Sequence, residues 1–161
     1  MTSETNHRIS VSLAKINDKD ALMKLAQQVH NESVFSDMPF SRVKFSAFYD
    51  KIINKKAICL VARIGDEIVG FIYATLGSYF IADSRPIATV SVIYIKKQIR
   101  DTLAGGKVAM RLVRSAKKFA KDHGVSHLLF HVTSGISIAN TDRFFRKIGA
   151  KTLGGNYAFK L

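Results

Sequence analysis

A glycine pair followed by a lysine stands where a strand-like run ends and a helical pattern begins. Gly105 and Gly106 carry no side chain, so another molecule can approach the backbone closely. The first N–H groups of a helix are unpaired and carry partial positive charge, which suits a phosphate. Lys107 and Arg111 add full positive charges. The segment 103–109 is therefore predicted to bind an anion, against the simpler interpretation of a turn before a helix.

The spacing in this segment excludes the two best-known phosphate-binding motifs. A Walker loop requires a glycine five positions before Gly106, where Asp101 stands, and a Ser or Thr after the lysine, where Val108 stands. The dinucleotide-binding pattern G-x-G-x-x-G is absent from the sequence. Neither class of nucleotide-binding protein is indicated.

Side chains that could hold a metal or form a disulfide are few. Cys59 is the one cysteine, which excludes an internal disulfide, and its apolar neighbours predict a buried, inert thiol. His127 and His131 alternate on one face of a late strand-like run. No third ligand accompanies them, so no metal site is expected.

The composition is strongly basic. The 161 residues include 25 Lys and Arg against 12 Asp and Glu, a formal net charge of +13. Such a charge attracts nucleic acid, an acidic protein, an anionic membrane surface or a phosphorylated cofactor. The first eight residues lack the apolar stretch of a signal peptide, and no apolar run approaches the roughly 18 residues of a membrane span. We expect a cytoplasmic protein with no membrane partner.

The elements that must position these residues follow from the apolar periodicity. It predicts strands and helices in the order β-α-α-β-β-β-α-β-α-β. The predicted segments are a strand over 9–16, helices over 22–29 and 45–53, strands over 57–64, 67–76 and 87–95, a helix over 108–120, a strand over 125–133, a helix over 141–147 and a strand over 157–161.

This order indicates an α/β (α+β) fold with a mixed, mostly antiparallel central sheet flanked by helices. Gly65-Asp66 is expected to turn a hairpin between two neighbouring strands. A doubly wound fold would instead alternate strand and helix throughout. Because no linker divides the sequence, we expect one domain over residues 1–161, with residues 1–8 flexible.

The run 93–109, followed by Leu112-Val113 and by Gly124-Val125, resembles the acyl-CoA motif of the GNAT superfamily of N-acetyltransferases. The predicted order of elements is similar to that of the family along nearly the whole chain. Three short strings more narrowly resemble acetyltransferases of bacteriophages and prophages: His30-Asn31-Glu32-Ser33, Met38-Pro39-Phe40 and Gly154-Gly155-Asn156-Tyr157.

The resemblance implies acetyl-CoA as co-substrate. The family's loop, Arg/Gln-x-x-Gly-x-Gly/Ala, would end here at Ala109, with Ala104 in place of Arg/Gln and Lys107 in place of the central glycine. It further implies that the central strand pairs with the pantetheine arm and separates from the strand 128–132 to admit it. The expected cofactor contacts are Ile93, Tyr94, Ile95, Leu103, Ala104, Gly105, Gly106, Lys107, Val108, Ala109 and Arg111.

The resemblance leaves the catalytic groups open. The family's usual tyrosine on the last helix, which protonates the leaving thiolate, is Phe145 here. Tyr157, Tyr94, a water molecule, or no acid at all, could serve instead. Glu32 is the leading candidate for the base, because it ends the helical region that lines the acceptor pocket in this fold. His131 near the thioester is a third candidate catalytic residue, and His30 could titrate near neutrality.

The predicted function is N-acetyl transfer from acetyl-CoA to an amine by direct attack. The alternative is a non-catalytic basic module of the same fold that binds nucleic acid or a protein. The acceptor, a small molecule or a protein, is not identified, and a homodimer is compatible with the sequence. The charge disfavours small cationic acceptors unless an acidic pocket around Glu32 and Asp37 offsets it.

Overall fold

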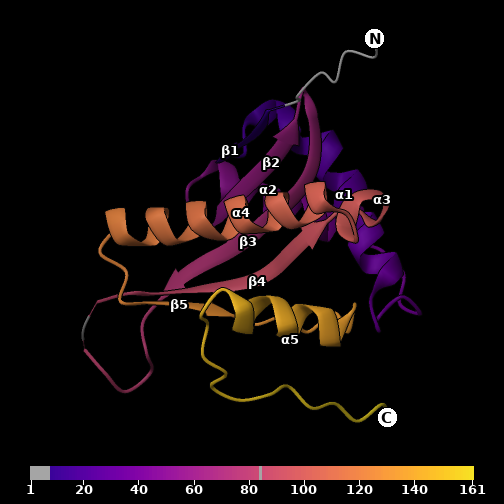
Figure 1. The fold of residues 1–161 in the computed structure, drawn as a ribbon. Coiled ribbons are helices and arrows are strands. Elements are labelled where there is room, and N and C mark those ends of the chain that lie inside the picture. The colour runs from indigo at the N-terminus through magenta and orange to yellow at the C-terminus, as the bar shows by residue number, and fades with distance from the viewer. Residues whose placement is uncertain (1–7, 84) are drawn as a thin grey trace.

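The computed structural model describes residues 8–83 and 85–161, in which five strands form one sheet in the order β1-β2-β3-β4-β5 (Figure 1). Strands β1 to β4 pair with their neighbours antiparallel, whereas β4 and β5 pair parallel. The mixed, mostly antiparallel sheet predicted from the sequence is thus confirmed. The strands are β1 (Ile9–Leu13), β2 (Ile58–Ile64), β3 (Glu67–Gly77), β4 (Ile87–Ile95) and β5 (His127–Phe130).

Helices cover both faces of this sheet. In Figure 1 the long α4 crosses the front of the sheet, α1 and α2 lie behind it, and α5 runs below α4 beside β5. The helices are α1 (Lys19–Glu32), α2 (Arg42–Ile53), α3 (Lys97–Arg100), α4 (Leu103–Asp122) and α5 (Ile138–Lys147), with a short 3-10 turn η1 (Ile16–Asp18) before α1. None of the helices that the structure describes is long and apolar enough to span a membrane.

The core has one layer on each face of the sheet. Val108 and Leu112 of α4 are fully buried against the strands. The helix packs this closely because β3 carries Gly70 beneath it. A Cβ at Gly70 would lie 2.8 Å from the carbonyl oxygen of Tyr94 and 3.3 Å from Val108. On the other face, α1 and α2 contribute Leu22, Leu25 and Tyr49 to the second layer.

The hairpin between β2 and β3 turns where the sequence predicts. Gly65 has a φ of 60°, in the left-handed region that favours glycine. The flanking residues Ile64 and Glu67 pair across the turn. This prediction is confirmed.

The parallel strands β4 and β5 pair over a short length only. Pairing runs from Ile87 opposite His127 to Val90 opposite Phe130. It ends with a bond from the N–H of His131 to the carbonyl oxygen of Val90 (2.8 Å). The predicted separation of these strands is confirmed.

Strands β4 and β5 diverge beyond this point because each follows a different path. On β4, Ser91 is an extra residue between two paired positions, which forms a bulge against β3. The strand then continues to Ile95. After β5 the chain turns toward the loop that follows α1, where the N–H of Val34 donates to the carbonyl oxygen of Ser134 (2.9 Å).

Several predicted boundaries are wrong. The strand predicted over 125–133 is limited to β5, because its last residues leave β4 for the α1 loop. The strand predicted over 157–161 does not form: Tyr157 and Phe159 are exposed and pair with no strand of the described chain. A strand without a neighbour has no partner for its backbone groups.

The polar stretch before α4 also differs from the prediction, since it contains the short helix α3, and α4 begins at Leu103 rather than at Val108. The flexibility expected of residues 1–8 falls, apart from Arg8, outside the described residues.

Candidate functional site

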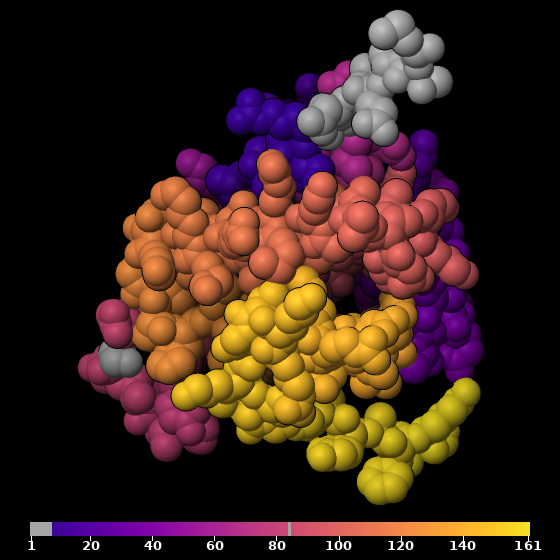
Figure 2. All heavy atoms as spheres, in the orientation of Figure 1, coloured from indigo at the N-terminus to yellow at the C-terminus, as the bar shows by residue number. Residues whose placement is uncertain are grey.

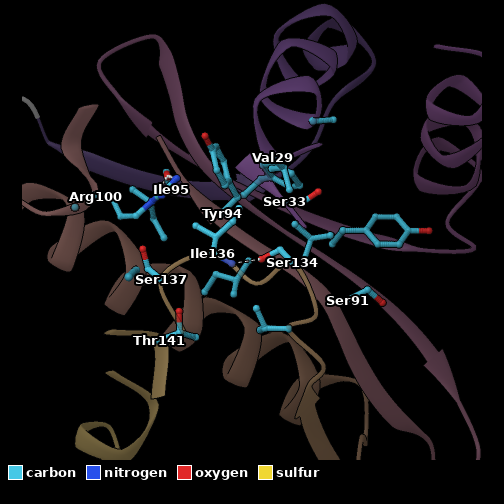
Figure 3. Close-up of a pocket in the computed structure, with 18 of the residues that line it drawn as sticks. Val29, Ser33, Ser91, Tyr94, Ile95, Arg100, Ser134, Ile136, Ser137 and Thr141 are labelled. Atoms are coloured by element: carbon cyan, nitrogen blue, oxygen red, sulfur yellow. Dashed lines mark hydrogen bonds between the residues drawn. The ribbon is translucent and has the colours of Figure 1, made fainter. Parts of the chain in front are cut away.

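A cleft of about 1230 Å³ opens where β4 and β5 separate. The surface is hollowed between the α3–α4 segment and α5 (Figure 2). The side chains around it come from α1 and α2, β4, the start of α4, the turn after β5, and α5 (Figure 3). Elements from all parts of the chain therefore meet at this one cavity.

One wall of the cleft is the free edge of β4. The N–H of Lys96 donates to the carbonyl oxygen of Val69, so Ile95 and its partner Gly70 form a non-hydrogen-bonded pair. The backbone N–H and C=O of Ile95, and of Ile93 two residues earlier, therefore point away from β3 toward the cleft. An extended ligand that carries amides can pair there as an added strand.

A second wall is the N-terminus of α4. The Thr102 hydroxyl caps the helix by accepting from the N–H of Gly105 (3.2 Å), and the N–H of Gly106 donates to the Thr102 carbonyl oxygen (3.0 Å). The N–H groups of Leu103 and Ala104 precede the first helical hydrogen bond. They are the donors that this helix offers to an anion.

The two glycines have different roles. A Cβ at Gly105 would lie 2.0 Å from the carbonyl oxygen of Ile99, so this glycine is required by the packing of α3 on α4. A Cβ at Gly106 would meet nothing within 4 Å, and Gly106 lines the cleft. Both glycines line the cleft, with open space beside Gly106, and the binding of a ligand at either glycine stays a prediction.

The predicted cofactor residues divide into two groups. Those that line the cleft are Ile93, Tyr94, Ile95, Leu103, Gly105, Gly106 and Ala109. Ala104, Lys107, Val108 and Arg111 do not line it: Val108 is core, and Arg111 donates to the carbonyl oxygen of Ile9 on the far side of α4. The resemblance alone gave no sign of which face of α4 meets the cleft.

A hydrogen-bonded cluster at the cleft wall escaped the sequence analysis. Arg100 donates to both oxygens of Glu32 (2.8 and 3.1 Å), and the Tyr94 hydroxyl donates to Glu32 Oε1 (2.5 Å). The guanidinium also donates to the carbonyl oxygen of Ile95 (3.1 and 3.2 Å) and lies 5.1 Å from the Tyr94 ring centroid. This Arg100–Glu32–Tyr94 cluster ties α1 to β4 and α3.

The cluster changes the interpretation of Glu32. The hydrogen bond from Arg100 holds the pKa of the Glu32 carboxyl below its ordinary value. Burial and the bond to Glu32 raise the pKa of the Tyr94 hydroxyl. A carboxylate with a lowered pKa and three donors is a weak base, and Glu32 does not line the cleft. The geometry does not favour Glu32 as the general base.

The other candidate catalytic residues lie away from the cavity. Tyr157 is 95% exposed in the C-terminal segment, and His131 is an exposed residue just after β5. Neither lines the cleft. Phe145 does line it and packs on Phe130 at 4.7 Å between ring centroids. Phe145, at the position where the resemblance implies a tyrosine, is thus at the site but has no hydroxyl to donate a proton.

Polar groups that do face the cleft include His30 and the hydroxyls of Ser137 and Thr141. Figure 3 shows Ser137 and Thr141 at the start of α5, across the cavity from Tyr94. The Nε2 of His30 lies 2.6 Å from the carbonyl oxygen of Met38. A carbonyl only accepts, so Nε2 carries the proton and Nδ1 of the neutral ring has the lone pair.

Cys59 and the histidines that the structure describes form no metal-binding cluster. Cys59 is buried as predicted, and burial raises its pKa to about 12, so the thiol is inert. Within residues 8–83 and 85–161, no group of three His, Cys, Asp or Glu could hold a metal ion.

Comparison with known proteins identifies the fold. No protein-family model and no curated protein sequence matches the chain. Solved structures of low sequence identity do match.

A transcriptional regulator from Bacillus halodurans C-125 matches with 19% identity and a TM-score of 0.73, over 96% of this chain and all of the other. The ribosomal-protein-alanine N-acetyltransferase from Brucella melitensis biovar Abortus 2308 matches with 14% identity and a TM-score of 0.70, over 96% and 100%.

A third structure, AAC(6')-Iy in complex with the bisubstrate analogue CoA-S-monomethyl-acetylneamine, matches with 13% identity and a TM-score of 0.75, over 96% and 98%. Similar structures are mostly acetyltransferases, with this one transcriptional regulator among them. The chain therefore has the GNAT-like fold that the sequence predicts, and its cleft lies where β4 and β5 separate beside the start of α4.

Proposed function

We propose that this protein is an N-acetyltransferase that transfers the acetyl group of acetyl-CoA to an amine by direct attack. The observation that carries the proposal is that the free edge of β4 and the N-terminus of α4 line the same cleft. The free edge of β4 suits an amide-bearing arm, and the N-terminus of α4 suits a pyrophosphate.

The residues present fit this co-substrate. Gly106 leaves open space at the start of α4, where the N–H group of Leu103, a residue that lines the cleft, would hold phosphate oxygens. Of the N–H groups of Ile93 and Ile95, one would pair with a pantetheine amide and the other would face the thioester oxygen. The carbonyl oxygen of Ile95 is already occupied by Arg100, so the donors of this edge outnumber its acceptors.

The reaction requires little from the side chains. The neutral amine forms a C–N bond to the thioester carbonyl carbon, the C–S bond breaks, and the proton lost by nitrogen is gained by the thiolate sulfur. A backbone N–H of the β4 edge stabilises the developing negative charge on the carbonyl oxygen. Because Phe145 has no hydroxyl and the Tyr94 hydroxyl is bound to Glu32, a water molecule supplies the proton to sulfur and regains one from the base that has deprotonated the nitrogen.

His30 is the base in this proposal. Its imidazole lines the cleft, and the contact of Nε2 with Met38 fixes the tautomer that leaves Nδ1 basic. It takes the place that sequence analysis gave to Glu32.

A CoA-release assay with a panel of amines tests transfer and the role of His30. We expect turnover by the native chain, and a loss of roughly 100-fold in kcat for His30→Gln, because general base catalysis is removed. The matched control is His127→Gln, since His127 is an exposed histidine of β5 outside the cleft. Equal rates in both variants would remove His30 from the mechanism.

A second function is favoured by three observations: Phe145 at the tyrosine position, the net charge of +13, and the similarity to a transcriptional regulator. It is the non-catalytic module that binds nucleic acid or a protein. Salt-sensitive DNA binding, with no thermal stabilisation by acetyl-CoA or CoA, would support this function against transfer. The bacteriophage source and the homodimer stay predictions.

A further inference from the structure

The cleft extends past the free edge of β4 into a space between the sheet and the helices α1 and α2. Walls here come from α1, α2 and β3. With a CoA ester along β4, this end of the cleft would receive the acceptor. The inference below concerns the chemistry of that end and rests on the proposed function.

The acceptor end is aromatic and aliphatic. Its rings include Phe45 and Phe48 of α2, Phe35 of the loop that follows α1, and Tyr73 of β3. Phe48 and Tyr73 meet edge to face, with centroids 5.6 Å apart. Phe35 and Phe48 remain 43% and 49% exposed, so their rings offer apolar surface that a ligand can cover.

Negative charge is missing from this end. Among the described residues that line the cleft, Asp101 is the one carboxylate, and it stands beside the start of α4. Arg100 also lines the cavity but is paired with Glu32, so the like charge comes from Arg143 and Lys147 of α5, which line the same cavity. An ammonium group that enters this cleft meets like charge, and its desolvation is not compensated.

Within the part of the chain that the structure describes, Glu32 and Asp37 form no acidic pocket that could offset this charge. Glu32 is bound to Arg100, and Asp37 is paired with Lys160 at 2.9 Å on the surface. Neither carboxylate lines the cleft.

The polar groups of this end are mostly engaged within the protein. The Ser33 hydroxyl donates to the carbonyl oxygen of His30 and accepts from the N–H of Phe35. The Tyr49 hydroxyl donates to the carbonyl oxygen of Lys15. Recognition here therefore depends on apolar contact and shape.

We propose that the acceptor is a monoamine carried on an aromatic or aliphatic body, and that polyamines and aminoglycosides are excluded. Only the reacting nitrogen enters the cleft as a polar group, and it must be neutral to attack. The remainder of the molecule packs against Phe45, Phe48 and Tyr73.

Competing amines test this proposal directly. Phenylethylamine is compared with spermidine and with kanamycin in the CoA-release assay on the full chain. We expect kcat/KM for phenylethylamine to exceed that for either polycation by at least roughly tenfold, the scale of discrimination by an apolar pocket. A higher kcat/KM for spermidine or kanamycin would overturn the proposal.

Two variants of Phe48 test whether the preference for phenylethylamine over polycations arises at this end of the cleft. Phe48→Ala is expected to lower kcat/KM for phenylethylamine by roughly tenfold. Phe48→Asp is expected to narrow or reverse the preference by raising the rate with spermidine. The control is Phe80→Ala, because Phe80 is an 83% exposed aromatic residue outside the cleft. An effect of Phe80→Ala equal to that of Phe48→Ala would place amine selection outside this cleft and contradict the proposal.

Amine binding is also measured by calorimetry without turnover, so that the two proposals can fail separately. Absence of transfer with tighter binding of phenylethylamine than of spermidine contradicts the proposed function and supports the apolar acceptor end. Transfer together with tighter binding of spermidine than of phenylethylamine supports the proposed function and contradicts the apolar acceptor end.

Discussion

Glu32 ends α1 with both carboxylate oxygens engaged by Arg100 and Tyr94. The side chains of Glu32 and Arg100 are each about one fifth exposed, at 20% and 19%. An ion pair with little solvent access and two-pronged geometry is stronger than an ordinary surface pair. The role of Glu32 is thus to hold the cleft wall together.

Replacing Glu32 tests this role through stability. We expect Glu32→Gln to lower the free energy of unfolding by about 1–2 kcal/mol, because the largely buried guanidinium of Arg100 loses its charged partner. Urea unfolding measures the change. Asp142→Asn is the control: Asp142 pairs with Arg146 on the exposed face of α5, where loss is expected to be under about 0.5 kcal/mol. Equal losses would contradict the structural role.

The same pair has a pH signature. The pKa of Glu32 is lowered in the folded chain relative to its ordinary value of 4.5. The stabilisation is therefore complete above the pKa of the unfolded chain and is lost as the pH falls through the lower pKa of the folded chain. The difference in stability between native protein and Glu32→Gln is expected to shrink below pH 4.5.

At the scale of elements, the contact of α3 with the start of α4 shapes the phosphate end of the cleft. This contact predicts opposite effects for two neighbouring substitutions. Gly105→Ala is expected to cost about 1–3 kcal/mol, because its methyl group would collide with the backbone at Ile99. Gly106→Ala is expected to stabilise by about 0.5–1 kcal/mol, since alanine is the better helix former and the space is open.

Urea unfolding of the two variants measures both changes, and each variant controls the other. The same sign for both would show that α3 does not pack on α4 in this way.

Local patterns predicted most of these elements, and long-range pairing decided the others. The apolar runs of β2 and β3 and the Gly65-Asp66 turn between them are local, so the hairpin could be predicted from them. The limit of β5 and the absence of a strand at 157–161 depend on which neighbour each segment meets, which no local pattern contains.

The same division applies to the site: the part with a local sequence signature could be predicted, and the part built by long-range contacts could not. The glycine pair indicated a helix start in this region, because a helix start has a local signature, although α4 begins at Leu103 rather than at Val108. The pairing of Arg100 with Glu32 joins residues 68 positions apart, so no spacing could reveal it. Phe45, Phe48 and Tyr73 likewise meet only when α2 packs on β3.

At the scale of the whole molecule, the charge of +13 and the lining of the cleft act on different steps. The overall field favours the approach of an anionic co-substrate such as a CoA ester. The cleft beyond β4 offers apolar rings at its acceptor end, and none of the described residues there is a carboxylate. A basic protein with an apolar acceptor pocket is expected to select its two substrates by opposite physical properties.

The central claim is that acetyl-CoA binds along the free edge of β4. Amide hydrogen exchange followed by NMR, with and without acetyl-CoA, tests it most directly, since the N–H groups of Ile93 and Ile95 face the cleft. We predict that exchange at these two amides slows at least roughly tenfold on binding, whereas exchange along β1, an edge strand that does not line the cleft, is unchanged. Unchanged exchange at Ile93 and Ile95 with saturating acetyl-CoA would contradict the account.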